Sequence, residues 1–208
     1  YEIMPSLVGS EMCIRDSRSY NKAFRGFDKS MRNLDLDYID LYLIHWPANK
    51  VRYKNPSEVN AVTWQALEEL YEEGRAKSIG VSNFLPHHIE ELKKSAKVLP
   101  MVNQIELHVG YMQEDVVEYN NNNGIITEGY SPLGTGALLE NEILWEMAKK
   151  YQTTASAICI SFLRKRGIIP LPKTTSPDRM SENLRLIRID EEDMEILNKL
   201  PFIGGHAH

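Results

Sequence analysis

Hydrophobic residues follow two different spacings along the chain. Between Ser19 and Leu34 they recur every three or four positions, which predicts an amphipathic helix. Residues 39–45 are instead almost continuously apolar, as expected for a strand that is covered on both faces. This run ends abruptly on His45-Trp46-Pro47, and proline cannot extend the hydrogen bonding of a sheet. A buried strand that ends on an imidazole and an indole suggests a functional role for its end.

The alternation of strand and helix patterns continues to the C-terminus. Four further strands are predicted at Lys77–Val81, Val102–Leu107, Ile125–Tyr130 and Ile168–Leu171. A helix is predicted from Val59 to Leu70, and two others begin at Pro86 and at Ser176. One helix is predicted to end near Gly124, and two helical segments precede Gly167. A last short helix is predicted from about Asp190 to Leu200. Gly74 and Gly167 are expected to end helices in the left-handed conformation, and Pro86 and Pro177 to begin them.

Short apolar strands that alternate with helices indicate a parallel sheet covered by helices. Two architectures remain open at this point: an open doubly wound sheet and a (β/α)₈ barrel. A doubly wound nucleotide-binding sheet usually carries G-x-G-x-x-G after its first strand, and only Gly134-Thr135-Gly136 comes close to it here. The α/β barrel is therefore favoured.

Composition and charge exclude several classes of function. The chain of 208 residues has a net charge of -5, which argues against nucleic acid as its partner. The sequence has no apolar run of the roughly 18 residues that a membrane helix needs. Cys13 and Cys159 form neither a metal-binding spacing nor a disulfide framework, and Cys159 is expected in the core. We therefore expect a cytoplasmic protein without a metal site.

Polar and aromatic residues follow each predicted strand. In a (β/α)₈ barrel the chemistry lies at the carboxyl ends of the strands, where the loops converge. The residues found there are His45 and Trp46, Ser82 and Asn83, Gln104 and Glu106, Tyr130 and Ser131, and Lys173 and Thr174. Taken singly, each has a structural alternative: a helix cap, an internally paired polar layer, an aromatic plug or a solvated basic surface. Their shared position favours a binding site.

One of these ends suits an anion. Lys173 and Thr174 directly precede the helix that begins at Ser176-Pro177-Asp178-Arg179. A cation, a hydroxyl group and the free N–H groups of a helix N-terminus together favour a phosphate.

Five segments of the sequence resemble the aldo-keto reductase family. They are LDYIDLYLIHWP, GRAKSIGVSNF, NQIELH, YSPLGTG and IPLPKTTSPDRMSEN, in this order. The resemblance runs from about Tyr20 to the C-terminus, with Val109 where the family often has proline. It implies a (β/α)₈ barrel that uses NADPH to reduce a small aldehyde or ketone.

The resemblance also implies roles for individual residues. His45 would orient the substrate carbonyl as the catalytic histidine, and Trp46 would line the substrate pocket beside it. Most of the matching positions would bind NADPH. For the nicotinamide and pyrophosphate these are Ser82, Asn83, Gln104, Tyr130, Ser131, Leu133 and Thr135; for the adenosine 2′-phosphate and adenine they are Lys173, Thr174, Arg179, Glu182 and Asn183.

The barrel is expected to be incomplete. A (β/α)₈ barrel has eight strands, and the histidine-bearing strand is the fourth in this family, so the first three βα units are expected to be missing. The aspartate, tyrosine and lysine that the family uses in catalysis have no matching position here. Residues 1–17 match no motif and are predicted to be a non-native segment, and residues 18–208 a partial barrel of strands four to eight.

Three functional hypotheses follow. The first is a fragment of a cytoplasmic NADPH-dependent reductase that is weak or inactive on its own. The second is a non-catalytic NADPH-binding or interaction protein on the same fold, and the third is an unrelated barrel enzyme. The open edges of a partial barrel also favour self-association, although the sequence leaves the oligomeric state open.

Overall fold

The computed structural model describes residues 20–202. The segment 1–17 and Cys13, on which two sequence predictions fall, lie outside this range. The chain divides into two compact units. Among the described residues, the first unit comprises 20–104 and Tyr119–Ile126, and the second comprises Ile105–Glu118 and 127–202.

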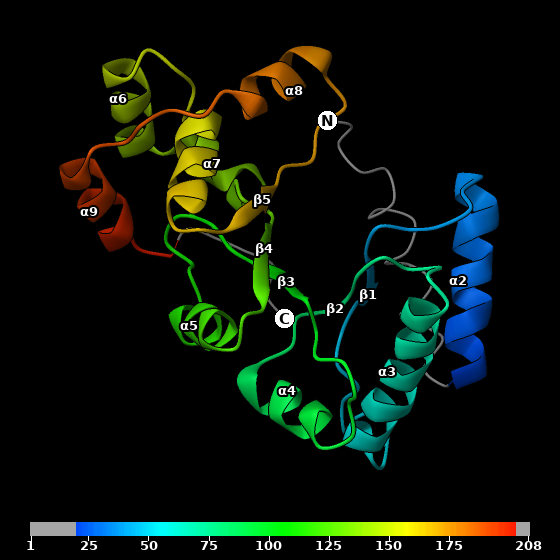
Figure 1. Ribbon diagram of the computed structural model, residues 1–208. Helices are drawn as coiled ribbons and strands as arrows, with labels where there is room; N and C mark the ends of the chain where they lie inside the picture. Colours follow the sequence, from blue (N-terminus) through cyan, green and yellow to red (C-terminus); the bar gives the residue numbers. More distant parts are fainter. Residues whose placement is uncertain (1–19, 203–208) are drawn as a thin grey trace. The chain divides into compact units, whose positions relative to one another are not determined.

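Parallel strands form the sheet of each unit (Figure 1). In the first unit, β2 (Ile79–Ser82) lies between β1 (Tyr42–Ile44) and β3 (Val102–Glu106), and the last two residues of β3 belong to the second unit. In the second unit β4 (Ile126–Tyr130) pairs with β5 (Ile169–Leu171). All five predicted strands are therefore present, and the pairings of β1 with β2, β2 with β3 and β4 with β5 are parallel, as predicted.

The strand predicted at residues 39–45 is shorter than expected. Ile39 makes only an isolated bridge to Ala76, and the regular strand covers Tyr42–Ile44. The exposed Asp40 forms a bend between them. A carboxylate that stays in water at this position interrupts the ladder, which a count of apolar residues does not reveal.

Helices alternate with the strands in the predicted order. They are α2 (Tyr20–Leu34), α3 (Pro56–Glu72), α4 (Pro86–Lys93), α5 (Glu114–Asn122), α6 (Glu142–Lys150), α7 (Ala155–Lys165), α8 (Pro177–Leu184) and α9 (Glu191–Lys199), with a 3₁₀ segment, η1 (Gly134–Glu140), before α6. Pro86 and Pro177 begin their helices, as predicted. Gly74 and Gly167 follow α3 and α7 with φ of +71° and +78°, which confirms the predicted left-handed ends. No helix in the described range is long and apolar enough to span a membrane.

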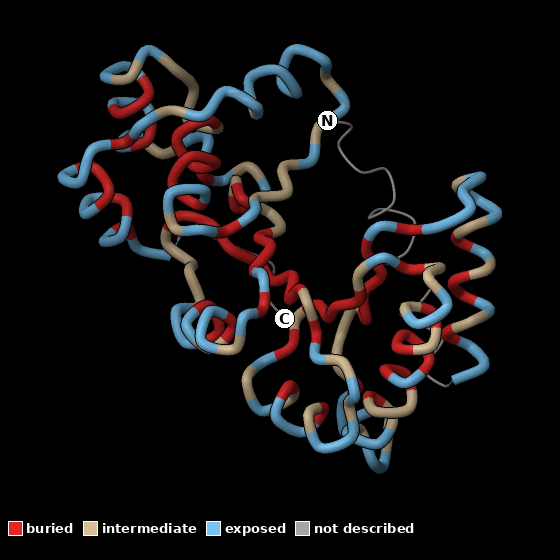
Figure 2. The backbone as a smooth tube through the Cα atoms, viewed as in Figure 1, coloured by how far each residue is buried: buried red, intermediate tan, exposed pale blue. Residues whose placement is uncertain are grey.

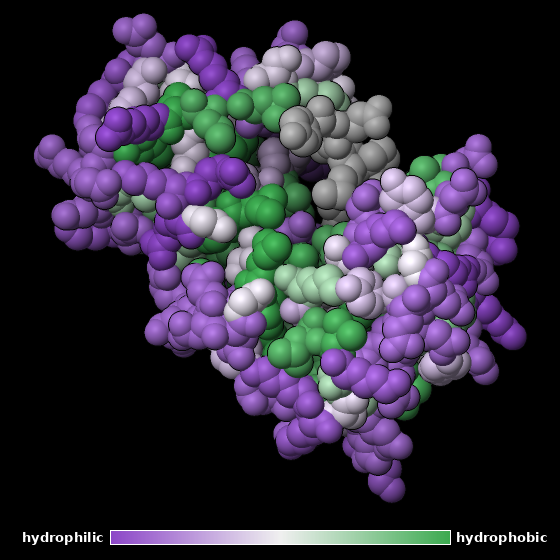
Figure 3. Space-filling view, in the orientation of Figure 1, coloured by the Kyte–Doolittle hydropathy of each residue, from purple (hydrophilic) through white to green (hydrophobic). Residues whose placement is uncertain are grey.

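The core of the first unit lies between its strands and the adjacent helices α2 and α3 (Figures 1 and 2). Phe27 of α2 meets Tyr42 of β1 edge to face at 5.1 Å, and both are fully buried. The outward surface of α2 and α3 is largely hydrophilic (Figure 3). This division of each helix into an apolar and a polar face is the one that the helical spacing predicts.

A buried carboxylate holds a loop of the same unit. Glu68 of α3 is 3% exposed and accepts hydrogen bonds from the backbone N–H groups of Lys97 and Val98, at 2.6 and 2.8 Å. Trp64, one helical turn earlier, donates its indole N–H to the carbonyl of Val98 at 2.9 Å. One face of α3 thus fixes the segment that leads into β3.

The core of the second unit surrounds α7. Ile158, Phe162 and Leu163 of this helix are fully buried against side chains from β3, α6 and α9. Cys159 is buried there too, as predicted, and burial raises the pKa of its thiol to about 12. A neutral thiol in this position behaves as a small apolar core residue.

Candidate functional site

The carboxyl ends of β1, β2 and β3 bring four predicted site residues together in the first unit. Asn83 donates through its side-chain amide to the carbonyl of His45 and to the hydroxyl of Ser82, each at 3.1 Å. The Ser82 hydroxyl in turn donates to the carbonyl of Gln104 at 2.8 Å, and the backbone N–H of Asn83 donates to the same carbonyl at 2.9 Å. His45, Ser82, Asn83 and Gln104 are therefore neighbours, as the strand-end prediction requires.

The loop that carries the histidine is fixed by helix α3. The rings of His45 and Trp46 lie 6.4 Å apart at 68°, and both residues are half-buried. Two residues after Trp46, the backbone N–H of Ala48 donates to the side-chain oxygen of Asn60 at 2.7 Å. Asn60 is only 5% exposed, so the loop is tied to a buried partner.

Three predicted site residues adopt an uncommon backbone conformation. Asn83, Ser131 and Thr135 have φ of +61°, +50° and +55°. Residues other than glycine rarely occupy this left-handed region, which costs roughly 1–2 kcal/mol. Such strain concentrates at functional sites, where the surrounding structure holds it in place. No sequence pattern indicated it, because none of the three is glycine.

The second unit carries Tyr130 at the end of β4. Tyr130 is half-buried, pairs with Leu171 of β5 and accepts at its carbonyl from the N–H of Leu107 at 3.2 Å. The chain then turns sharply, since the N–H of Gly134 donates to the carbonyl of Ser131 at 2.9 Å. The Thr135 hydroxyl bonds within the turn, to the carbonyl of Gly134 at 2.7 Å.

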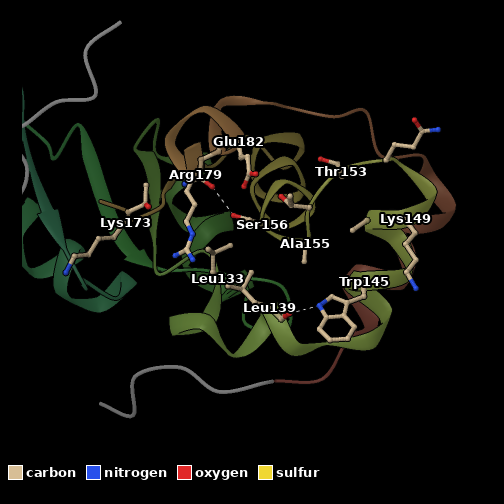
Figure 4. A pocket seen from close by; sticks show the side chains of 15 residues that line it. Leu133, Leu139, Trp145, Lys149, Thr153, Ala155, Ser156, Lys173, Arg179 and Glu182 are labelled. Atoms are coloured by element: carbon tan, nitrogen blue, oxygen red, sulfur yellow. Dashed lines mark hydrogen bonds between the residues drawn. The ribbon is translucent and has the colours of Figure 1, made fainter. Parts of the chain in front are cut away.

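A cavity of about 570 Å³ lies within the second unit (Figure 4). Six predicted site residues line it: Leu133, Lys173, Thr174, Arg179, Glu182 and Asn183. They come from the loop after β4, the loop after β5 and helix α8. The structure thus brings together all the residues that were expected to hold the adenosine part of a cofactor. Tyr130, Ser131 and Thr135 are not among the residues that line it.

The cavity has a cationic end. In Figure 4, Arg179 extends from α8 toward Leu133, and Lys173 lies on the same side of the cavity. Both residues are exposed, and within residues 20–202 neither forms an ion pair. Their charges are therefore available to a ligand.

The predicted contribution of free backbone N–H groups needs correction. The Thr174 hydroxyl accepts from the N–H of Ser176 at 3.2 Å, and the Ser176 hydroxyl accepts from the N–H of Arg179 at 3.5 Å. Both donors are engaged because serine and threonine bond readily to nearby backbone groups at a helix start. Attraction of an anion here rests mainly on the side chains of Lys173 and Arg179.

The opposite side of this cavity was not predicted from the sequence. That side is formed by residues of η1, α6 and the start of α7: Leu139, Trp145, Ala148, Lys149, Gln152, Thr153, Thr154, Ala155 and Ser156. Helix α7 begins there because the Thr154 hydroxyl caps it by accepting from the N–H of Ala157 at 3.2 Å. The run Thr153-Thr154 ahead of a predicted helix was the one available signal.

In the described part of the chain, no three His, Cys, Asp or Glu side chains gather as a metal ion would require. The polar side chains that line the cavity are hydroxyl, amide and cationic groups together with the carboxylate of Glu182, and the cations among them suit an organic ligand with a phosphate.

Comparisons with known proteins agree with this arrangement. The model of the aldo/keto reductase family matches residues 9–201. Glyoxal reductase of Bacillus subtilis (strain 168) is 39% identical over 187 residues, which cover 89% of this chain and 65% of that protein. An aldo-keto reductase from a Medee basin deep-sea metagenome library has a TM-score of 0.82 at 39% identity, covering 89% of this chain and 68% of that chain. A Bombyx mori aldo-keto reductase in complex with NADP has a TM-score of 0.78 at 31% identity, covering 88% and 64%.

The chain spans about two thirds of the length of the curated relatives it matches, 65% for the glyoxal reductase. The family match begins at residue 9, ahead of Tyr20, where the family motifs were expected to begin. The solved structures confirm the predicted α/β class with the (β/α)₈ barrel fold. Because the family model matches far more than half of its residues, the chain belongs to the aldo/keto reductase family.

Proposed function

We propose that this chain carries the NADPH-binding part of a reductase that acts on small aldehydes and ketones. The observation that carries the proposal is the cavity of the second unit, where six residues assigned from the family resemblance lie together. Lys173 and Arg179 offer the unpaired positive charge that an adenosine 2′-phosphate needs. The NADP complex of the Bombyx mori relative supports the cofactor, and the glyoxal reductase supports the substrate class.

The strand ends of the first unit have complementary tasks in this proposal. Bound NADPH supplies a hydride. Ser82, Asn83 and Gln104 hold the nicotinamide carboxamide, for which amides and hydroxyls are suitable partners. His45 donates a hydrogen bond from its ring to the substrate carbonyl oxygen, which draws electrons from the carbon that is reduced. Trp46 lines the substrate pocket beside it.

Tyr130 at the end of β4 and two residues of the loop that follows complete the proposed cofactor site. Tyr130 packs against the nicotinamide ring and leaves one face open. Ser131 and Thr135 follow the pyrophosphate, where their left-handed backbone turns the chain sharply.

Reduction of a carbonyl also needs a proton donor for the alkoxide that forms. The resemblance implies a tyrosine paired with a lysine, and we assign neither in this sequence. General acid catalysis contributes about 10²–10⁴-fold, so we expect this chain alone to be a weak reductase at most. Steady oxidation of NADPH by glyoxal at about 1 s⁻¹ or faster would contradict this expectation.

The test of the cofactor assignment is a fluorescence titration of the chain with NADPH and with NADH. We expect clear preference for NADPH, and a roughly tenfold loss of NADPH affinity in K173A and in R179A, since each removes a charge-assisted hydrogen bond. R188A is the matched control, because Arg188 is an exposed cation just after α8 that does not line the cavity. Equal affinity for NADPH and NADH would refute the assignment.

A non-catalytic NADPH-binding protein is the alternative. It predicts the same result in the titration. It also predicts that no carbonyl compound oxidises NADPH in the presence of this chain or of a longer chain that includes further βα units.

The cytoplasmic location and the division of the chain between residues 17 and 18 stay predictions from the sequence.

A further inference from the structure

A hydrogen bond fixes the orientation of Asn183 at the edge of the cavity. The Ser156 hydroxyl donates to the side-chain oxygen of Asn183 at 2.9 Å (Figure 4). Both residues are half-buried and both line the cavity. Ser156 lies in the first turn of α7 and Asn183 in the last turn of α8, so the bond joins two helices that pack together.

The position of Ser156 is well defined. Thr154 caps α7 through the N–H of Ala157, which fixes the turn that contains Ser156. A second serine of α7, Ser161, is 3% exposed and accepts from the N–H of Ile187, just after α8, at 3.0 Å. The two serines have different roles. Ser161 bonds to the backbone of Ile187, whereas Ser156 bonds to the side chain of Asn183, which lines the cavity.

The bond determines what Asn183 can offer to a ligand. A side-chain amide has one oxygen that accepts and one nitrogen that donates two hydrogen bonds. The Ser156 proton takes one of the two lone pairs of this oxygen and so fixes which way the amide is turned. In this orientation the NH₂ group is the donor that Asn183 can offer to the cavity. An adenine presents acceptors at its ring nitrogens and a donor at its exocyclic amine.

We propose that Ser156 is a positioning residue that sets the amide of Asn183 so that its NH₂ group donates to a ring nitrogen of the adenine. The inference rests on the proposed function, and it adds a residue from α7 that does not itself need to touch the base. Without the hydroxyl, the amide is free to rotate by 180° and to present its oxygen to an acceptor, which repels it.

A double-mutant cycle tests this coupling, with the NADPH dissociation constant of the full chain as the readout. We expect S156A to weaken binding roughly threefold to tenfold, the size of one misdirected hydrogen bond. S156T keeps the hydroxyl and should restore most of the affinity. In the N183A background, S156A should have no further effect, because the amide that it positions is gone.

S161A is the matched control. It removes a buried hydroxyl of the same helix and should lower the thermal midpoint while leaving the NADPH dissociation constant unchanged. If S156A lowered the NADPH affinity equally in the parent chain and in N183A, or did not lower it at all, the positioning role would be wrong. NADPH binding by the parent chain would be unaffected by that result. A parent chain that does not bind NADPH would overturn the proposed function and this inference together.

Discussion

The strand ends of the first unit and the cavity of the second unit hold their proposed ligand-binding residues in opposite ways. Ser82 and Gln104 are only 1% and 3% exposed, and backbone hydrogen bonds tie them to neighbouring strands. Lys173, Arg179 and Glu182 are exposed and make no ion pair within the described range. In the first unit the same side chains support both the fold and the proposed site, whereas these three exposed side chains of the second unit form no ion pair in the described part of the chain that would support the fold. Asn183 differs from them, because it accepts a hydrogen bond from Ser156.

The difference has a physical origin. A side chain at the end of a buried parallel strand must pair its polar atoms inside the protein, because water cannot reach them. A side chain at the rim of an open cavity is solvated until a ligand arrives. Substitutions at the strand ends should therefore cost folding stability, and substitutions around the cavity should cost binding affinity with little effect on stability.

The largest expected effect comes from glycines within the strands. In β2 of the first unit, a Cβ at Gly80 would lie 2.5 Å from the carbonyl oxygen of Val102 and 2.8 Å from a methyl of Leu43. We expect G80A to lower the free energy of unfolding by roughly 2–3 kcal/mol, since the obstacle is backbone of the adjacent strand. Urea titration of the full chain, followed by circular dichroism, measures the loss.

G129A in β4 is the matched variant from the second unit. A Cβ at Gly129 would lie 3.2 Å from Cγ2 of Ile168 and from Cβ of Leu107, so these neighbours need to move by only a few tenths of an ångström. We expect a loss of about 1 kcal/mol or less. Equal losses in G80A and G129A would mean that the close backbone contact at Gly80 costs no more stability than the wider contacts at Gly129.

A smaller effect is expected at Asn83, which combines a strained backbone with two side-chain hydrogen bonds. N83A should lower the free energy of unfolding by about 2 kcal/mol, because it loses the bonds and keeps the positive φ. N83G loses the same bonds but tolerates φ of +61°, so it should be about 1 kcal/mol more stable than N83A. Both should bind NADPH less tightly. If the two variants unfolded at the same urea concentration, backbone strain at this position would be negligible.

The exposed cations of the cavity should show the opposite behaviour. K173A and R179A are expected to unfold within about 0.5 kcal/mol of the parent chain, since neither side chain has an ion-pair partner in the described structure. Their NADPH affinity should nevertheless fall, as proposed above. A large loss of stability in either variant would mean that the second unit, like the first, uses its site residues to hold the fold.

Much of this arrangement could be predicted from the sequence. The apolar runs located all five strands, and parallel strands place their carboxyl ends on one side, so the strand order alone was enough to group His45, Ser82 and Gln104. The starts of α4 and α8 and the end of α7 followed from proline and glycine. These features depend on local spacing and on the general geometry of a parallel sheet.

The remainder depends on contacts between distant residues. The amide of Asn83 reaches the carbonyl of His45, 38 positions earlier, and Ser156 reaches Asn183, 27 positions later. No local pattern encodes such pairs. The exposed Asp40 likewise shortened β1, because a single carboxylate outweighs the apolar residues on either side.

The smallest expected effect concerns a charged contact of the second unit, outside the proposed site. Asp190 accepts from the N–H of Asp193 at 2.9 Å and pairs with Lys150 at 2.9 Å, so it caps α9 and ties it to α6. The N–H bond, followed by Lys150 and Tyr151, lowers the pKa of Asp190 to about 2. An unfolded aspartate has a pKa of about 3.9, so the folded chain releases this proton more readily. The stabilisation is therefore complete above about pH 4 and is lost as the pH falls to about 2.

D190N keeps a residue that caps helices well but removes the charge, which isolates the pH-dependent part. We expect D190N to be less stable than the parent chain at pH 5 and equally stable near pH 2, in urea titrations repeated across this range. Since Asp190 is exposed, added salt should narrow the difference at pH 5. E195Q is the control, because Glu195 forms only an exposed pair with Lys199 at 3.6 Å and should leave the acid profile unchanged. If D190N kept the acid profile of the parent, the charge of Asp190 would have no part in anchoring α9, which would then rely on its buried Met194 and Leu197 and on the pairs of Asp193 with Lys150 and of Glu191 with Lys165.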